Sequence, residues 1–401
     1  EHEKNQGRKV LNVPNLRFPE FQGEWARMRL DTFTERVMRK NKNNQSKLPL
    51  TISAQYGLVD QITFFNKVVA STDMSNYYLL KKGEFAYNKS YSSDYPWGAI
   101  KRLDNYDQGA LSSLYICFAP QDNVVSDFIL QYFESPKWHK GVSEIAVEGA
   151  RNHGLLNVSV QDFFHTYHYV PEDKEEQIKI AKLLMLLDER IATQNKIIDN
   201  LQSLIKGISN MLLNPETGTT VRLGDILNER IERTKVNNQH EVLSSTVNGL
   251  FSQRKYFSKD IASENNIGYK IIRLHDIVLS PQNLWMGNIN YNDKFEVGIV
   301  SPSYKVFSIT ENYDKRYIAA LLKTHRALYD YMLVSEQGAS IVRRNLNFEA
   351  FEQLVFKIPS ITTQRKIGSI ISSLKSHLEI ENMIKVTYQS QKQYLLRQMF
   401  I

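Results

Sequence analysis

Two long segments of the chain, residues 175–213 and 364–399, carry apolar side chains at the alternating four-then-three spacing of a heptad repeat. Polar and charged residues fill the intervening positions, so the first segment predicts an amphipathic helix of roughly 55 to 60 Å at about 1.5 Å per residue. Because one helix cannot bury such a stripe alone, we predict that the second segment pairs with it as an antiparallel coiled coil. The predicted seam comprises Ile180, Leu184, Leu187, Ile191, Gln194 and Ile198, together with Ile367, Ile371, Leu374, Leu378 and Glu381.

The two halves of the chain match each other, which indicates an internal duplication. The matched pairs are Leu30 with Leu223, Gly57 with Gly249, Tyr77 with Tyr269, Gly109 with Gly298, Gly149 with Gly338, Pro171 with Pro359, and Gln177 with Gln364. The separation within these pairs falls in one direction only, from 193 to 187 residues. A few small deletions in one copy would produce this drift, whereas the alternative, two unrelated amphipathic helices, would not.

Each globular half shows short strand signals mixed with short helix signals, and we predict an α+β fold for both. A strand-turn-strand pattern spans residues 79–87, and helix patterns occupy residues 127–133 and 317–333. The predicted order is globule, helix, globule, helix. The predicted boundaries are 1–171 for an N-terminal arm and the first domain, 172–213 for the first spacer helix, 214–359 for the second domain, and 360–401 for the second spacer helix.

The composition fits a protein with real cores and no disulfide framework. The chain has 401 residues, of which 42% are hydrophobic, and a single cysteine, Cys117, which lies in an apolar run and is predicted to be a buried thiol. No apolar run is long enough to span a membrane and residues 1–7 are polar, so we expect a cytoplasmic protein. The formal net charge of +7 permits binding to a polyanion.

Motifs of the common catalytic sites are missing from the sequence. No two prolines adjoin, which excludes the Asp/Asn-Pro-Pro-aromatic tetrad of amino-methyltransferases, and no glycine precedes a lysine, which excludes a Walker A phosphate loop. The nine histidines show no metal-binding spacing. The acidic stretch at residues 171–174 precedes a predicted helix and is interpreted as its cap. The sequence therefore predicts a chain without catalytic residues, bound metal or cofactor.

Three polar, aromatic or basic loops recur at matching places in the two halves, with different residues in each. Arg, Asn, Gln and Ser are the residue types that read base edges, and Arg or Lys also bind phosphates. Taken singly, such a loop is more often plain solvated surface. The predicted DNA-contacting residues are Gln55, Tyr56, Lys89, Ser90, Tyr91, Ser92, Trp97, Arg151, Asn152 and His153 in the first half and Asn248, Gln282, Asn283, Trp285, Asn288, Arg343, Arg344 and Asn345 in the second.

Over nearly its whole length, the chain resembles the specificity subunit (HsdS) of type I restriction-modification systems. The resemblance depends on the duplicated layout and on loosely defined motifs, namely Leu16-Arg17-Phe18-Pro19, Gly23-Glu24-Trp25, Lys82-Gly83-Glu84-Phe85, Glu148-Gly149-Ala150-Arg151, and Pro171 with Glu176-Gln177 and Ile180. The second copy departs from the pattern, with Thr363-Gln364 in place of Glu176-Gln177 and Ser340 near the position of Arg151.

The resemblance implies two target recognition domains, each reading one half of a split double-stranded DNA site, on helices that dock two modification subunits. It also implies that methyl transfer from S-adenosylmethionine, and ATP- and Mg-dependent translocation with cleavage, belong to partner methyltransferase and restriction subunits. Physical reasoning leads to a similar expectation, since duplicated domains with unlike loops suit an asymmetric, interrupted site. The competing hypotheses are a non-catalytic protein-interaction scaffold without sequence preference and a self-contained restriction enzyme.

Overall fold

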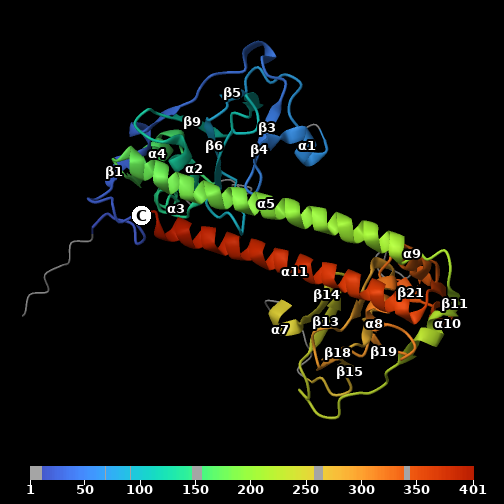
Figure 1. The fold of residues 1–401 in the computed structure, drawn as a ribbon. Coiled ribbons are helices and arrows are strands. Elements are labelled where there is room, and N and C mark those ends of the chain that lie inside the picture. Colours follow the sequence, from blue (N-terminus) through green and yellow to red (C-terminus); the bar gives the residue numbers. More distant parts are fainter. Residues whose placement is uncertain (1–10, 68, 91, 147–155, 257–264, 338–343) are drawn as a thin grey trace, which may run out of the picture. The chain divides into compact units, whose positions relative to one another are not determined.

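The computed structural model describes residues 11–67, 69–90, 92–146, 156–256, 265–337 and 344–401 (Figure 1). The chain forms two compact units. The first unit comprises the chain up to Gln194 together with Ile384–Ile401, and the second comprises Asn195–Met383. Each unit therefore contains one globular domain and part of each long helix.

In its described residues, the first unit contains ten short strands and several short helices. In chain order these are β1 (Ala26–Arg29), η1 (Leu30–Thr32), β2 (Thr34–Arg36), η2 (Lys42–Asn44), β3 (Pro49–Ser53), β4 (Gly57–Asp60), α1 (Gln61–Phe65), β5 (Tyr78–Lys81), β6 (Phe85–Asn88), β7 (Ala99–Arg102), β8 (Gln108–Leu111), β9 (Ile116–Pro120), α2 (Ser126–Glu134), α3 (His139–Ile145), α4 (Val160–Phe164) and β10 (Tyr167–Val170). The strands form sheets of order β2-β9-β6-β7 and β4-β3-β8-β5, and β1 pairs antiparallel with β10.

The second unit follows a similar order of elements, with the additional strand pair β20–β21 in its described residues. They are β11 (Thr219–Arg222), α6 (Leu223–Ile226), β12 (Leu227–Glu229), β13 (Leu243–Thr246), β14 (Gly249–Ser252), α7 (Gln253–Tyr256), β15 (Lys270–Arg273), β16 (Ile277–Leu279), η3 (Leu284–Met286), β17 (Ile289–Tyr291), β18 (Val297–Val300), β19 (Lys305–Ile309), α8 (Lys315–Leu321), α9 (His325–Leu333), β20 (Ser335–Gln337), β21 (Arg344–Leu346), α10 (Phe348–Glu352) and β22 (Val355–Ile358). The sheet β12-β19-β16-β17 has the topology of β2-β9-β6-β7, and β11 pairs with β22 as β1 does with β10. The predicted duplication is confirmed.

At two of the matched glycine pairs, the structure shows why both units require a glycine. A Cβ added to Gly109 would lie 2.4 Å from Leu50 Cδ1, and one added to Gly298 would lie 2.5 Å from Leu243 Cδ1. The hairpin glycines that open β4 and β14 both have a positive φ, of 82° at Gly57 and 139°. Close packing and turn geometry thus preserve glycine at these places in both copies.

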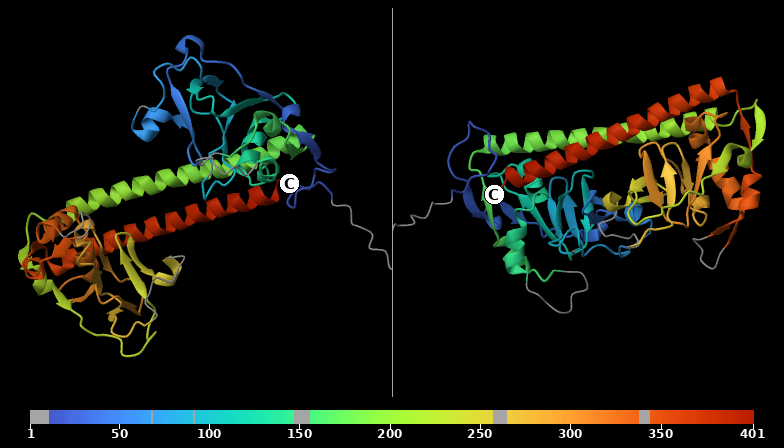
Figure 2. Two further views of the ribbon diagram at one scale, coloured as in Figure 1. Left: turned by 180° about the vertical axis from the view of Figure 1, so that it is seen from behind. Right: turned by 90° about the horizontal axis from the view of Figure 1, so that it is seen from below.

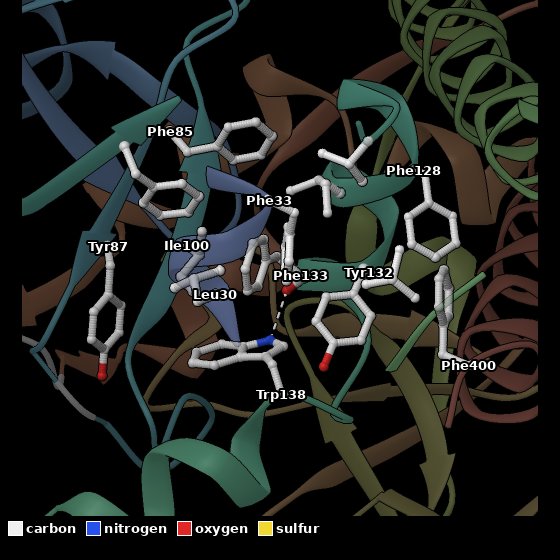
Figure 3. Close-up of a cluster of buried hydrophobic side chains, with 14 of the residues drawn as sticks. Leu30, Phe33, Phe85, Tyr87, Ile100, Phe128, Tyr132, Phe133, Trp138 and Phe400 are labelled. Atoms are coloured by element: carbon white, nitrogen blue, oxygen red, sulfur yellow. Dashed lines mark hydrogen bonds between the residues drawn. The ribbon is translucent and has the colours of Figure 1, made fainter. Parts of the chain in front are cut away.

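The core of the first unit is rich in aromatic side chains (Figure 3). Phe85 stacks on Phe118 at a centroid distance of 5.4 Å, and the indole N–H of Trp138 donates a hydrogen bond of 3.0 Å to the backbone oxygen of Phe133. Phe400, just beyond the last helix, packs edge-on against Tyr132 at 5.7 Å. The end of the chain is therefore anchored in the core of the first unit.

The predicted antiparallel coiled coil is confirmed. Helices α5 (Lys174–Leu212) and α11 (Ile361–Gln398) are continuous and pack together (Figures 1 and 2). In the first unit the start of α5 packs on the end of α11, through Ile180 and Leu184 against Leu396. In the second unit the end of α5 shares a core cluster with Ile367 and Ile371 at the start of α11.

The predicted seam positions are less exposed than the rest of the helix surface. Ile180, Leu184, Leu187, Gln194, Ile198, Ile367 and Ile371 are buried, and Ile191, Leu374, Leu378 and Glu381 are half-buried. Lys392, a half-buried residue near the end of α11, forms an ion pair of 2.5 Å with Asp188 of α5. Its charge is thus neutralised by the facing helix.

Other local predictions also have outcomes in the structure. Cys117 is buried, as predicted. The predicted helix over residues 317–333 is instead two helices, α8 and α9, because the hydroxyl of Thr324 caps a new helix by accepting a hydrogen bond of 3.3 Å from the N–H of Ala327. The cap predicted before α5 is present, since Asp173 accepts a hydrogen bond of 2.8 Å from the N–H of Glu175. Across the described residues, no helix has the length and apolar character needed to cross a membrane.

Candidate nucleic-acid interface

Two of the three predicted loops meet in both units. In the first unit the backbone N–H of Leu156 donates a hydrogen bond of 2.9 Å to the oxygen of Lys89. In the second unit the N–H of Arg344 donates one of 3.1 Å to the oxygen of Gln282. Segments separated by more than 60 residues in the sequence are thereby joined at the same place in each copy.

The described candidates of the first unit lie in two turns. Gln55 and Tyr56 are exposed in the turn between β3 and β4, where the N–H of Tyr56 bonds to the hydroxyl of Ser53 at 3.1 Å. Ser90 and Ser92 are exposed after β6.

Two neighbouring candidate residues are half-buried and contact the protein itself. The ammonium of Lys89 donates a hydrogen bond of 3.3 Å to the backbone oxygen of Val158, and Trp97 is half-buried against the aromatic core. Both residues therefore help to hold the loop in place.

In the second unit, Trp285 and Arg344 come together. The guanidinium carbon of Arg344 lies 5.1 Å from the centroid of the Trp285 ring, which is the geometry of a cation–π contact. The same guanidinium donates a hydrogen bond of 3.2 Å to the backbone oxygen of Met332 in α9. Arg344 therefore ties β21 both to the η3 turn and to α9, a structural task that the sequence did not suggest.

Asn288 holds the β13–β14 turn in place through hydrogen bonds to Ser245. It is buried, its Oδ1 accepts a hydrogen bond of 2.7 Å from the hydroxyl of Ser245, and its Nδ2 donates one of 3.1 Å to the backbone oxygen of Ser245. Both ends of this amide are engaged within the protein. Asn248, at the tip of the turn, is exposed, as are Gln282 and Asn345, while Asn283 is half-buried.

Five candidates, Tyr91, Arg151, Asn152, His153 and Arg343, lie outside the described residues.

An exposed aromatic cluster beside the β3–β4 turn was missed by the sequence analysis. Phe64 and Phe65 of α1 are exposed, and the Phe64 ring lies 6.4 Å from that of Tyr56 and 5.0 Å from that of Phe65. Rings of this kind stack on nucleic-acid bases or pack against apolar side chains. Their Phe-Phe signal is visible in the sequence, but only the fold places it beside the turn.

Among the described residues, no group of three or more His, Cys, Asp or Glu side chains is arranged to hold a metal ion. The interface therefore consists of amide, hydroxyl, aromatic and basic groups on a duplicated framework. Groups of these kinds can bind a ligand through hydrogen bonds, ring stacking and ionic contacts.

A comparison with protein families decides the identity of the second half. Residues 215–387 match the type I restriction modification DNA specificity domain. Through these residues, the second half of the chain is similar to the type I restriction-modification specificity family. The resemblance predicted from the sequence is confirmed, and the described role of this domain, DNA specificity, agrees with a non-catalytic recognition chain.

Solved structures share the fold of this chain. One is a crystal structure of a type I restriction-modification S subunit from M. genitalium, with a TM-score of 0.59 and 14% identity over 97% of this chain and 99% of that one. Another, described as showing complex assembly and conformational transition of a type I system, has a TM-score of 0.52 and 13% identity over 93% of this chain and 96% of that one. The sequence has no match among curated proteins.

Proposed function

We propose that this chain is the DNA sequence-specificity subunit of a type I restriction-modification complex, and that each unit reads one half of an asymmetric, bipartite site. The observation that carries the proposal is that the two units share one backbone framework but expose different residues on it. The β3–β4 turn presents Gln55 and Tyr56, whereas the equivalent β13–β14 turn presents Val247 and Asn248. Two frameworks of one kind approach duplex DNA in one way, and different side chains then select different bases.

The outer faces of the long helices supply a second argument, for protein partners. Helix α5 carries exposed apolar side chains at Leu186, Ile197, Leu204 and Met211. At about 3.6 residues per turn, these positions lie within about 40° of one another and roughly 100° from the centre of the buried seam. An apolar stripe that the coiled coil does not cover is typical of a protein interface, and we assign it to the methyltransferase subunits.

The division of labour follows from these two surfaces. The globular domains contact double-stranded DNA, the helices dock two modification subunits, and restriction subunits join the full complex. S-adenosylmethionine, ATP and Mg are used by those partner chains, and this chain supplies only recognition.

A domain exchange tests the proposal. Residues 25–170 are replaced by the same region of a relative with a different specificity, and the methylated sequence is determined for the complex with its modification subunits. We expect one half of the recognised site to change while the other half and the gap are retained. The matched control replaces residues 218–359 and should change the other half only.

Two outcomes would contradict the proposal. If both half-sites changed together in one exchange, the assignment of one half-site to each unit would be wrong. If the parent complex bound a random duplex pool with no sequence preference, the scaffold hypothesis would replace it.

A further inference from the structure

The second unit contains a cavity of about 320 Å³ between its globular domain and the α11 helix. One wall is formed by the β13–β14 turn and β17, and the opposite wall by the α11 residues Ile371, Ser372, Lys375 and Glu379. Phe251 and Tyr291 add aromatic surface. The volume lies within the range of small-molecule sites, roughly 300 to 1,000 Å³.

The cavity contains more cationic than anionic side chains. Lys294, Arg316, Lys323 and Lys375 line it, against Asp293 and Glu379. The Glu379 carboxylate is already paired with Lys294 at 2.8 Å, and Arg316 has Asp314 at 3.8 Å. Within the described part of the chain, neither Lys323 nor Lys375 has a carboxylate oxygen within 4.0 Å of its ammonium.

Lys323 is held in place beside Lys375. Its ammonium donates a hydrogen bond of 2.6 Å to Oδ1 of Asn290, whose Nδ2 is in turn bonded to the backbone oxygen of Thr246 at 2.7 Å. Burial lowers the pKa of Lys323 to about 8, and the charge of Lys375 acts in the same direction. Lys375 itself is exposed and lines the cavity from the helix. The two ammonium groups repel each other, the Asp293 carboxylate offsets part of this repulsion at Lys375, and a bound anion would offset more of it.

We propose that this cavity binds a phosphate group, held between Lys323 and Lys375 with Arg316 and Asn248 at its rim. A phosphate carries up to two negative charges and several acceptor oxygens, which matches two ammonium groups that lack a close ion-pair partner better than a single carboxylate does. The remaining volume and the aromatic wall accommodate the sugar or base attached to the phosphate. The group belongs either to the backbone of bound DNA, in which case the inference rests on the proposed function, or to a free phosphate ester.

A thermal-shift titration of the full chain with inorganic phosphate and with AMP tests the site itself. At constant ionic strength set by chloride, either anion should raise the melting temperature of the parent. Lys375→Gln and Lys323→Gln should each lower the affinity for the anion, obtained from this titration, at least tenfold. The control, Lys366→Gln, removes the same charge from an exposed position nine residues earlier on the opposite face of α11 and should leave it unchanged.

A duplex-binding arm identifies the source of the phosphate. If the site holds a backbone phosphate, Lys375→Gln should lower the affinity of the complex with modification subunits for cognate and for unrelated duplexes by the same factor. The slope of log affinity against log salt should also become smaller by about 0.9. A free ester predicts unchanged duplex binding together with the lost thermal shift.

The inference and the proposed function can fail separately. If the complex bound no duplex, the proposed function would be lost, but a phosphate-dependent shift that disappears in Lys375→Gln would still establish the site. The inference is overturned if neither anion stabilises the parent beyond chloride and Lys375→Gln binds duplex as the parent does. It is also overturned if Lys366→Gln has the same effect as Lys375→Gln.

Discussion

The side-chain oxygen of Gln177 accepts a hydrogen bond of 2.7 Å from the backbone N–H of Val125, the residue that caps α2. The Nε2 of the same side chain donates one of 2.8 Å to the backbone oxygen of Pro171. In the second unit Gln364 repeats the arrangement with the N–H of Asp314 at 3.0 Å and the oxygen of Pro359 at 2.8 Å. One amide in each copy thus fixes the start of a long helix to its globular domain.

This amide contact predicts a matched pair of destabilised variants. Gln177→Leu and Gln364→Leu each leave a backbone N–H and a backbone C=O without their side-chain partner, at sites where the glutamine itself is at least 97% buried. We expect each to lower the free energy of unfolding by about 1 to 3 kcal/mol, measured by urea denaturation. The control is Gln202→Leu, at an exposed position on α5. Equal stability of Gln177→Leu and Gln202→Leu would show that the contact is dispensable.

A second contact joins the N-terminal arm to α5 in the first copy. The Nε and Nη2 of Arg17 each donate a hydrogen bond of 2.7 Å to the carboxylate of Glu176, which is 1% exposed, and the indole N–H of Trp25 lies 3.2 Å from it. Thr363 occupies the position of Glu176 in the second copy. This ion pair fastens the N-terminal arm to the start of α5.

Removing one partner of this ion pair should lower the free energy of unfolding more than removing both partners. Arg17→Ala leaves the buried carboxylate of Glu176 unpaired, and we expect a loss of about 3 to 5 kcal/mol in the free energy of unfolding. The double variant Arg17→Ala with Glu176→Gln removes the stranded charge and should recover part of that loss. Denaturant titrations of both single variants and the double variant measure the coupling, and strictly additive losses would contradict it.

The sequence predicted the features that have local or periodic signals. Heptad spacing indicated both long helices, and drifting glycine pairs indicated the duplication, because close packing such as that of Gly109 on Leu50 allows no side chain. Features that depend on tertiary contacts were not predictable. Lys323 and Lys375 are far apart in the chain and only the fold brings them to one cavity. Likewise Arg344, chosen as a base reader, is engaged by Trp285 and α9, a role that loop composition does not reveal.

His168 gives the first unit a pH-dependent stability. It is buried, with Nδ1 2.8 Å from the hydroxyl of Tyr132 and Nε2 2.8 Å from that of Thr166. The Thr166 hydroxyl donates to the backbone oxygen of Phe163 at 2.7 Å, so it accepts from Nε2–H, and Nδ1 accepts from Tyr132. The imidazole is therefore neutral in the folded protein, and burial lowers the pKa of His168 to about 3.

The sign of the effect follows from proton binding. Between pH 3 and about 6.5 the unfolded chain holds a proton on His168 that the folded chain does not, so the free energy of unfolding falls as the pH is lowered through this window. From this group alone we expect a loss of about 1 kcal/mol between pH 7 and 5.5. In His168→Gln the loss over that interval should be smaller by this amount. The exposed His165→Gln should behave as the parent, and a pH dependence of stability in His168→Gln equal to that of the parent would contradict the argument.

The length of the coiled coil is predicted to set the gap between the two half-sites. Helices α5 and α11 each run from one unit into the other. Four residues inserted after Asn195 and four after Asn382 add about 6 Å and turn each helix by about 40°. Duplex DNA advances about 3.4 Å per base pair, with a turn of about 34° per base pair. One or two extra base pairs therefore match both the added length and the added rotation.

Seven-residue insertions at the same two places provide the contrasting case. They add about 10 Å, close to the rise of three base pairs, but turn the helix by only about −20°, whereas three base pairs turn by about 100°. We expect the four-residue variant to methylate a site whose half-sites are unchanged and whose gap is longer by one or two base pairs. The seven-residue variant should fold and assemble but lose most of its activity. The measurement is the methylated sequence of each variant beside the parent. A parental gap with full activity in both variants would show that the globular domains, and not the helices, set the spacing.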